Sequence, residues 1–190
     1  MQEAHRLGLP VAAHAHGVTA IMDAVEAGVD TLEHVSFLSA TGGRPEPELL
    51  ASVANSPSFV SLTLGRDPRH PFPDHPAMTS QLETIVSTIG GLYKMGAKVV
   101  LGSDAGIGPF KPHDVLPYAV SDAVDLGFSP LDALASATSV AARACGVEDR
   151  KGRIAVGADA DLLAVRGNPA TDPTVLRNVQ AVFRAGIRVR

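Results

Sequence analysis

Short apolar runs alternate along this chain with stretches of helical periodicity, and this alternation restricts the fold more than any other feature. The apolar runs cover residues 10–14, 29–34, 59–64 and 99–104. Each run is short enough for a strand, and the segments between them are long enough for helical crossovers. Because parallel strands can only be joined by crossover connections, such alternation is typical of parallel sheets. The sequence therefore predicts an α/β fold built from four strand–helix units.

Several of the intervening helices carry boundary signals. Residues 18–27 have one apolar face, and Gly28 is suited to end that helix. The stretch 78–95 has apolar residues at spacings of three and four, which predicts one amphipathic helix. Further helices are expected over about 113–126 and over 129–145, where a serine can cap and a proline suits the first helical position.

The pattern changes after residue 150. Residues 162–165 are apolar, and residues 179–189 alternate like a pair of strands with a turn at 185–186. We therefore divide the chain into an α/β part, residues 1–150, and a small β segment, residues 151–190. An open doubly wound sheet can be built from four units, whereas a complete (β/α)8 barrel needs eight units and about 250 residues.

Composition excludes several functional classes. Sixteen basic and 20 acidic residues give a net charge of −4, so there is no basic excess to neutralise a nucleic-acid backbone. No apolar run approaches the roughly 18 residues that a membrane helix needs, and no signal peptide is visible. One cysteine excludes an internal disulfide and a multi-cysteine metal site. We expect a cytoplasmic protein that acts on a small molecule and binds neither nucleic acid nor membrane.

Polar side chains stand where three of the predicted strands end. The first run leads into His14 and His16, the second ends at His34, and the fourth ends at Asp104. The carboxyl ends of parallel strands share one edge of the sheet, which is where ligands bind in such folds. Converging imidazole and carboxylate groups suit a zinc ion. Two alternatives stay open here, because His16 can serve a turn and Asp104 can stabilise one.

Other polar residues lie in predicted loops. His113 follows the loop after the fourth run, so it could reach a substrate or cap the helix that it opens. Arg66 and Arg69, in the proline-rich stretch 65–77, could engage a substrate carboxylate, and solvated loop charge is the alternative interpretation. Cys145, which lies in the helix expected over 129–145 and not in a loop, is expected to be a small core residue.

Five segments of the chain resemble the amidohydrolase superfamily, in its imidazolonepropionase-like and Xaa-Pro dipeptidase-like branch. They are VAAHAHG (11–17), AGVDTLEH (27–34), LGSDAG (101–106), SPLDALASATSVAARACGVEDRKGRIAVGADADLLAV (129–165) and AVFRAGIRVR (181–190). The resemblance extends over essentially the whole chain. It implies the second half, strands five to eight, of a metal-dependent hydrolase (β/α)8 barrel, followed by the C-terminal part of a small β-sandwich.

The resemblance also implies the chemistry. It points to hydrolysis of amide, cyclic amide or dipeptide C–N bonds by a metal-bound hydroxide, with one or two divalent metals, normally zinc. The metal ligands would be His14, with His16 as the alternative, then His34 and Asp104. Asp104 would also be the catalytic base and then the acid. His16 and His113 would lie near the substrate.

The sequence departs from the family pattern in two respects. The first-strand His-x-His pair and the fourth-strand carboxylated lysine are missing, and no lysine stands at a predicted strand end. We therefore expect a truncated, N-terminally incomplete hydrolase that is impaired on its own. The alternative hypothesis is a non-catalytic half-barrel module that forms a homo-oligomer or complements a separate N-terminal half. A phosphoesterase on an open α/β sheet is a third hypothesis.

Overall fold

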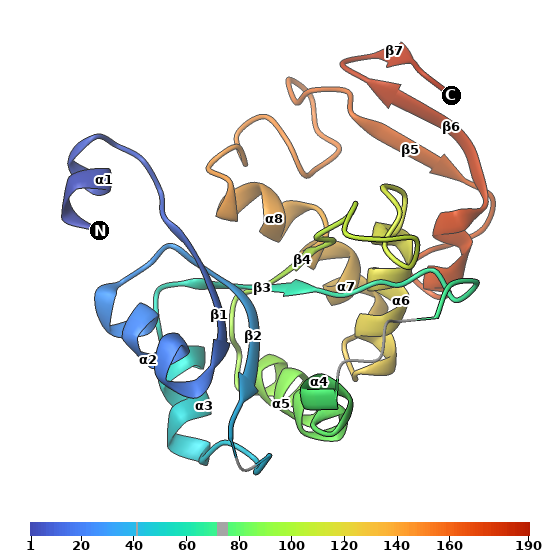
Figure 1. The fold of residues 1–190 in the computed structure, drawn as a ribbon. Coiled ribbons are helices and arrows are strands. Elements are labelled where there is room, and N and C mark those ends of the chain that lie inside the picture. Colours follow the sequence, from blue (N-terminus) through green and yellow to red (C-terminus); the bar gives the residue numbers. More distant parts are fainter. Residues whose placement is uncertain (41, 72–75) are drawn as a thin grey trace. The chain divides into compact units, whose positions relative to one another are not determined.

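The computed structural model describes residues 1–40, 42–71 and 76–190, with the side chains of Ala77 and Met78 excepted. It forms two compact units. The first unit comprises residues 1–63 and 71–100, and the second comprises residues 64–70 and 101–190. Figure 1 labels the helices and strands of both units.

The first unit is built around a sheet in which β1, β2 and β3 pair in parallel. Its strands are β1 (Ala12–Gly17), β2 (Thr31–Leu38), β3 (Phe59–Thr63) and the start of β4 (Val99–Gly102), in the order β1-β2-β3-β4. The pairs β1–β2 and β2–β3 are both parallel, with Ala12 opposite Thr31 and Thr31 opposite Phe59. This confirms the predicted α/β fold. The second strand continues four residues beyond His34, so the expectation that it ends at this histidine is wrong.

The helices of the first unit connect and cover these strands. They are α1 (Gln2–Arg6), α2 (Val18–Ala27), α3 (Pro47–Ala54), α4 (Pro76–Thr79) and α5 (Leu82–Lys94). Helix α2 has the predicted bounds, and Gly28 ends it in the left-handed conformation, with φ of 73°. The predicted single helix over 78–95 is interrupted instead. Gln81, at the interruption, is buried, and its side-chain amide bonds to both backbone groups of Ser39.

The core of the first unit centres on β2. Leu32, Val35 and Phe37 of this strand are fully buried, and α2 and α5 both contact it. A strand between two parallel neighbours is covered on both faces, which explains why the run from Val35 to Phe37 is buried throughout. Each such side chain contributes about 1.5–3 kcal/mol relative to an exposed position. This packing supports the polar residues that the strand also carries.

The second unit combines helices with a small antiparallel sheet. Its elements after β4 are α6 (Leu116–Asp125), α7 (Pro130–Ser136), α8 (Ser139–Ala144), β5 (Leu162–Val165), η1 (Pro173–Arg177), β6 (Val179–Arg184) and β7 (Ile187–Arg188). The strands pair in the order β5-β6-β7, and Ala185 and Gly186 form the predicted turn. Within the described residues, no helix combines the length and the apolar character that crossing a membrane requires.

Two helix predictions in this unit need correction. The helix expected over 129–145 begins as predicted, since the Ser129 hydroxyl accepts a hydrogen bond from the amide of Asp132 at 3.1 Å. It breaks at residues 137–138, where Gly152 lies so close that a Cβ would be 2.7 Å from the carbonyl oxygen of Thr138. Cys145 consequently ends the short α8 in an exposed position, so its assignment to the core is wrong. The helix expected from His113 begins at Leu116.

Candidate metal centre

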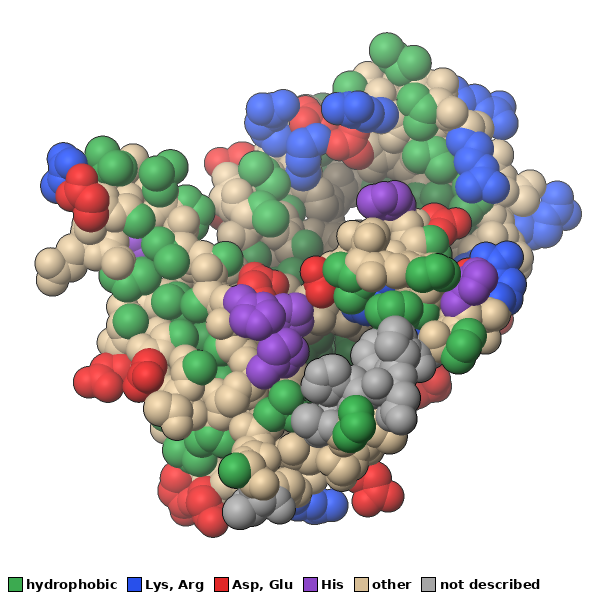
Figure 2. All heavy atoms as spheres, in the orientation of Figure 1, with side chains coloured by type: hydrophobic (Ala, Val, Ile, Leu, Met, Phe, Trp, Pro, Cys, Tyr) green, Lys and Arg blue, Asp and Glu red, His purple; other side chains and the backbone are tan. Residues whose placement is uncertain are grey.

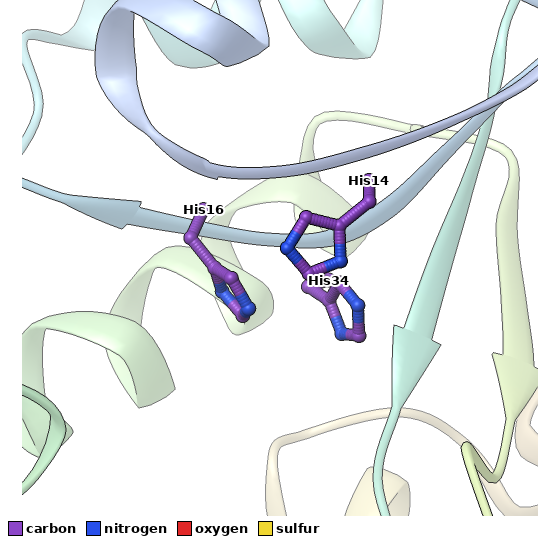
Figure 3. Close-up of side chains that lie close together, drawn as sticks. All are labelled: His14, His16 and His34. Atoms are coloured by element: carbon purple, nitrogen blue, oxygen red, sulfur yellow. The ribbon is translucent and has the colours of Figure 1, made fainter. Parts of the chain in front are cut away.

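Three histidines of the first unit lie together on β1 and β2. His14 and His16 are two residues apart in an extended strand, so both side chains leave the same face, and His34 comes from the neighbouring strand. The ring centroids of His14 and His16 are 4.8 Å apart. The ring of His34 lies 4.5 Å from each of the other two. Figure 3 shows the three imidazoles facing one another, and Figure 2 shows a patch of histidine side chains at the surface.

An irregularity in β2 shapes this cluster. Ala15 is opposite His34 and Gly17 is opposite Leu38, so one residue of β1 faces three residues of β2. Across the irregularity the φ angles of His34, Val35 and Phe37 are positive, at 72°, 50° and 50°. Such values are uncommon for residues other than glycine and are unfavourable for a β-branched residue. The buried Val35 and Phe37 side chains hold the backbone in this conformation.

Two hydroxyl groups lie beside the rings. Nδ1 of His34 lies 2.8 Å from Oγ1 of Thr63, the last residue of β3. Nδ1 of His16 lies 2.9 Å from Oγ of Ser36, which the irregularity of β2 brings beside it. Neither Ser36 nor Thr63 was singled out in the sequence, because no local pattern relates a hydroxyl to a ring 20 or 29 residues away.

The donor set fits a divalent metal ion. Each of the three histidines offers a ring nitrogen, and these nitrogens all lie within 4.8 Å of one another. Neutral imidazoles are ordinary ligands of zinc, and nitrogens gathered from two neighbouring strands can share one ion. A metal-bound imidazole normally donates its other ring N–H to an oxygen acceptor, and the hydroxyls beside His16 and His34 place an oxygen at that position.

Asp104 and His113, the other predicted site residues, belong to the second unit. Asp104 follows β4 in the left-handed conformation, with φ of 49°. The carbonyl of the preceding residue, Ser103, accepts a hydrogen bond of 2.7 Å from Lys111 Nζ. Burial lowers the pKa of Lys111, and the nearby carboxylate of Asp104 opposes that shift. His113 is exposed, and its ring lies against Gly106 of the same loop.

The arginines of the predicted loop 65–77 differ in their surroundings. Arg69 donates to both carboxylate oxygens of Asp67, at 2.9 Å from Nε and 2.6 Å from Nη2. Arg66 is exposed. Residues 72–75 of this loop lie outside the described residues. The carboxylate that Arg69 engages in this structure is therefore one of the chain's own.

The structure thus brings together His14, His16 and His34. His14 and His34 were predicted as ligands, and His16 was predicted as a substrate contact or an alternative ligand. The signal for its place in the cluster was available, because alternate residues of a strand share a face. The ligand role of Asp104 and the substrate role of His113 stay predictions.

Comparisons with known proteins agree with one another. The model of the amidohydrolase family matches residues 1–189. Ochratoxinase from Aspergillus niger is 28% identical over 184 residues, which is 96% of this chain and 38% of that protein. The crystal structure of a Xaa-Pro dipeptidase with bound methionine superposes with a TM-score of 0.82 at 29% identity, covering 100% of this chain and 47% of that one.

A putative prolidase from Bifidobacterium longum gives a TM-score of 0.80 at 29% identity, covering 99% of this chain and 48% of that one. The chain therefore spans less than half the length of each of these relatives.

Proposed function

This chain belongs to the amidohydrolase family, and from that premise we propose that it carries part of the active site of a metal-dependent hydrolase acting on C–N bonds. The observation that carries the proposal is the cluster of His14, His16 and His34 at two adjacent parallel strands. The similar proteins include a Xaa-Pro dipeptidase and a prolidase, which favours an amide, cyclic amide or dipeptide-like substrate.

The proposal includes an architecture. The strands β1 to β4 would correspond to strands five to eight of a (β/α)8 barrel, and β5 to β7 to part of a small β-sandwich, with the division near residue 150. The parallel pairing of β1 to β3 and the antiparallel pairing of β5 to β7 support this assignment. Eight strands close such a barrel, so the other four would come from outside these 190 residues.

In the proposed mechanism, His14 and His34 would hold a divalent ion, for which zinc is the best match to the donor set. When bound, such an ion supplies Lewis acidity, which polarises a carbonyl and acidifies water. Asp104, assigned from its place in LGSDAG (101–106), accepts a proton from water and delivers it to the leaving nitrogen. His113 would bind the substrate, and His16 would bind it or serve as the alternative metal ligand. Overall, the carbonyl carbon gains the OH of water, the nitrogen gains the proton, and the C–N bond breaks.

Metal titration and hydrolysis assays test this function. We expect the 190-residue chain to bind zinc stoichiometrically, and His14→Ala and His34→Ala to weaken binding at least tenfold. Asp104→Asn is expected to reduce the hydrolysis of Xaa-Pro dipeptides at least a hundredfold, the usual contribution of a general acid–base group. The exposed His70→Ala is the matched control and should change neither quantity. Zinc affinity that is the same in wild type, His14→Ala and His34→Ala contradicts the proposal.

The alternative of a non-catalytic module predicts a different outcome of the same assays. Such a module would bind zinc without turning over any dipeptide or amide. It would gain activity only on association with another copy or with a polypeptide that supplies the remaining strands. Sedimentation analysis of the chain, with and without zinc, measures that association.

A further inference from the structure

We propose that Ser36 and Thr63 are positioning residues, whose hydroxyls hold the imidazoles of His16 and His34 by Nδ1 so that each ring presents Nε2 to the ion. This inference rests on the proposed function, since the ion is the one that function requires, and it takes His16 in its alternative role as a metal ligand. It assigns a role to two residues that make no contact with a substrate in the proposed mechanism.

The contact of Thr63 with His34 joins two neighbouring strands. Thr63 ends β3, which pairs with β2, and its Oγ1 lies 2.8 Å from Nδ1 of His34. A neutral imidazole carries one proton, so a ring that coordinates through Nε2 must carry that proton on Nδ1. The hydroxyl oxygen of Thr63 can then accept from Nδ1–H. Coordination through Nε2 therefore keeps the contact with Thr63, whereas coordination through Nδ1 would break it.

The contact of Ser36 with His16 depends on the irregular part of β2. Three residues of β2 face His16 alone, and the middle one is Ser36. Its Oγ lies 2.9 Å from Nδ1 of His16, while the flanking Val35 and Phe37 are fully buried at positive φ. The buried side chains of Val35 and Phe37 thus stabilise an unfavourable backbone conformation. That conformation places the hydroxyl of Ser36 beside the imidazole of His16.

The two contacts act on rings that share an orientation. The planes of His16 and His34 are 19° apart and their centroids are separated by 4.5 Å, so the rings are stacked. His14 meets both rings edge-on, at 84° and 74°. With a hydroxyl at Nδ1 of each stacked ring, both rings can donate from Nδ1 and leave Nε2 for the ion. Such outer partners commonly set metal affinity, and their loss weakens it by 10–100-fold.

The test combines imidazole tautomers with zinc affinity. Long-range 1H–15N NMR of the metal-free chain should show Nδ1–H tautomers for His16 and His34. Thr63→Val removes the hydroxyl at nearly constant volume, and should shift only His34 toward a tautomer mixture. It should also weaken zinc binding roughly 10–100-fold, measured by competition with a chromophoric chelator. Thr63→Ser keeps the hydroxyl and should restore both readouts.

Ser36→Ala should affect His16 in the same way and leave His34 unchanged. Ser58→Ala is the matched control, because Ser58 is a buried serine of the same unit whose hydroxyl bonds to the carbonyl of Val29. We expect it to lower stability without changing tautomers or zinc affinity.

The outcomes separate this inference from the proposed function. Unchanged tautomers and affinities within twofold of wild type in Thr63→Val and Ser36→Ala overturn the positioning role, and so does an equal loss of affinity in Ser58→Ala. A wild-type chain that binds no zinc overturns the proposed function instead. The tautomer shifts in the metal-free variants then still decide whether the hydroxyls orient the rings.

Discussion

The side chain of Asp67 is only 2% exposed. Its negative charge is balanced by the largely exposed side chain of Arg69, two residues later. Both oxygens of the carboxylate accept hydrogen bonds from the guanidinium, and one also accepts from the Arg69 amide at 3.0 Å. These contacts lower the pKa of Asp67 from 3.8 to about 2. A buried carboxylate without this partner would be unfavourable, so the pair stabilises the loop that follows β3.

Arg69→Gln should therefore destabilise the chain in a pH-dependent manner. Because the folded-state pKa lies below the unfolded value of 3.8, the stabilisation is complete above about pH 5 and is lost as the pH falls through the folded-state pKa of about 2. The difference in unfolding free energy between wild type and variant should be largest near pH 7 and shrink to a small remainder at pH 2. Urea denaturation across this range measures it. Arg66→Gln, in the same exposed loop, is the control, and an equal pH-dependent loss there would contradict the assignment.

At the scale of elements, the loop that begins after β3 approaches the backbone at the start of α6 closely. Gly65 has φ of 84°, and a Cβ there would lie 2.9 Å from both Val115 O and Ala119 N. The amide of Gly65 donates to the carboxylate of Asp122 at 3.0 Å, and burial raises the pKa of that carboxyl while this bond opposes the shift. The loop therefore lies against α6 without space for a side chain.

Gly65→Ala should destabilise the chain more than backbone strain alone explains. Gly157→Ala is the matched control, because Gly157 has φ of 85° and a Cβ there would meet nothing within 4 Å. The control should cost about 1–2 kcal/mol for a left-handed alanine. Gly65→Ala should cost roughly 1–3 kcal/mol more for overpacking. Equal losses in chemical denaturation would show that α6 does not restrict this loop.

At the scale of the whole molecule, the described chain is two compact units, and the three clustered imidazoles all lie in the first. A ligand that binds only the folded state stabilises the part of the structure that carries its site. Metal binding should therefore stabilise one unit more than the other. The segments that gain stability indicate which residues are ligands.

Zinc should slow amide hydrogen exchange most strongly in β1 and β2. At a free concentration a hundred times the dissociation constant, the stabilisation is about 2.7 kcal/mol. Mass spectrometry with and without zinc measures the amide exchange of each segment separately. Protection that extends to residues 103–111 would support Asp104 as a ligand, whereas protection confined to the first unit would identify the three histidines as the ligand set. Uniform protection of every segment would contradict a local site.

Much of the fold and part of the site were predictable from local sequence. The four strands of the larger sheet, the bounds of α2 and the cap at Ser129 follow from periodicity, a terminal glycine and a serine before proline, all read within a few residues. The family follows from motifs such as LGSDAG (101–106), and His14 and His34 were predicted as ligands on that basis.

Tertiary structure alone decided the remaining features. The interruption at Gln81 accompanies a bond to Ser39, 42 residues earlier, and the orientation of His34 depends on Thr63, 29 residues later. The irregular backbone of β2 persists because its apolar side chains are buried between neighbours that the strand itself does not specify. Helix caps and strand periodicity arise from interactions within one or two turns of chain, whereas ring orientation and backbone strain are set by contacts that form only when distant segments pack together.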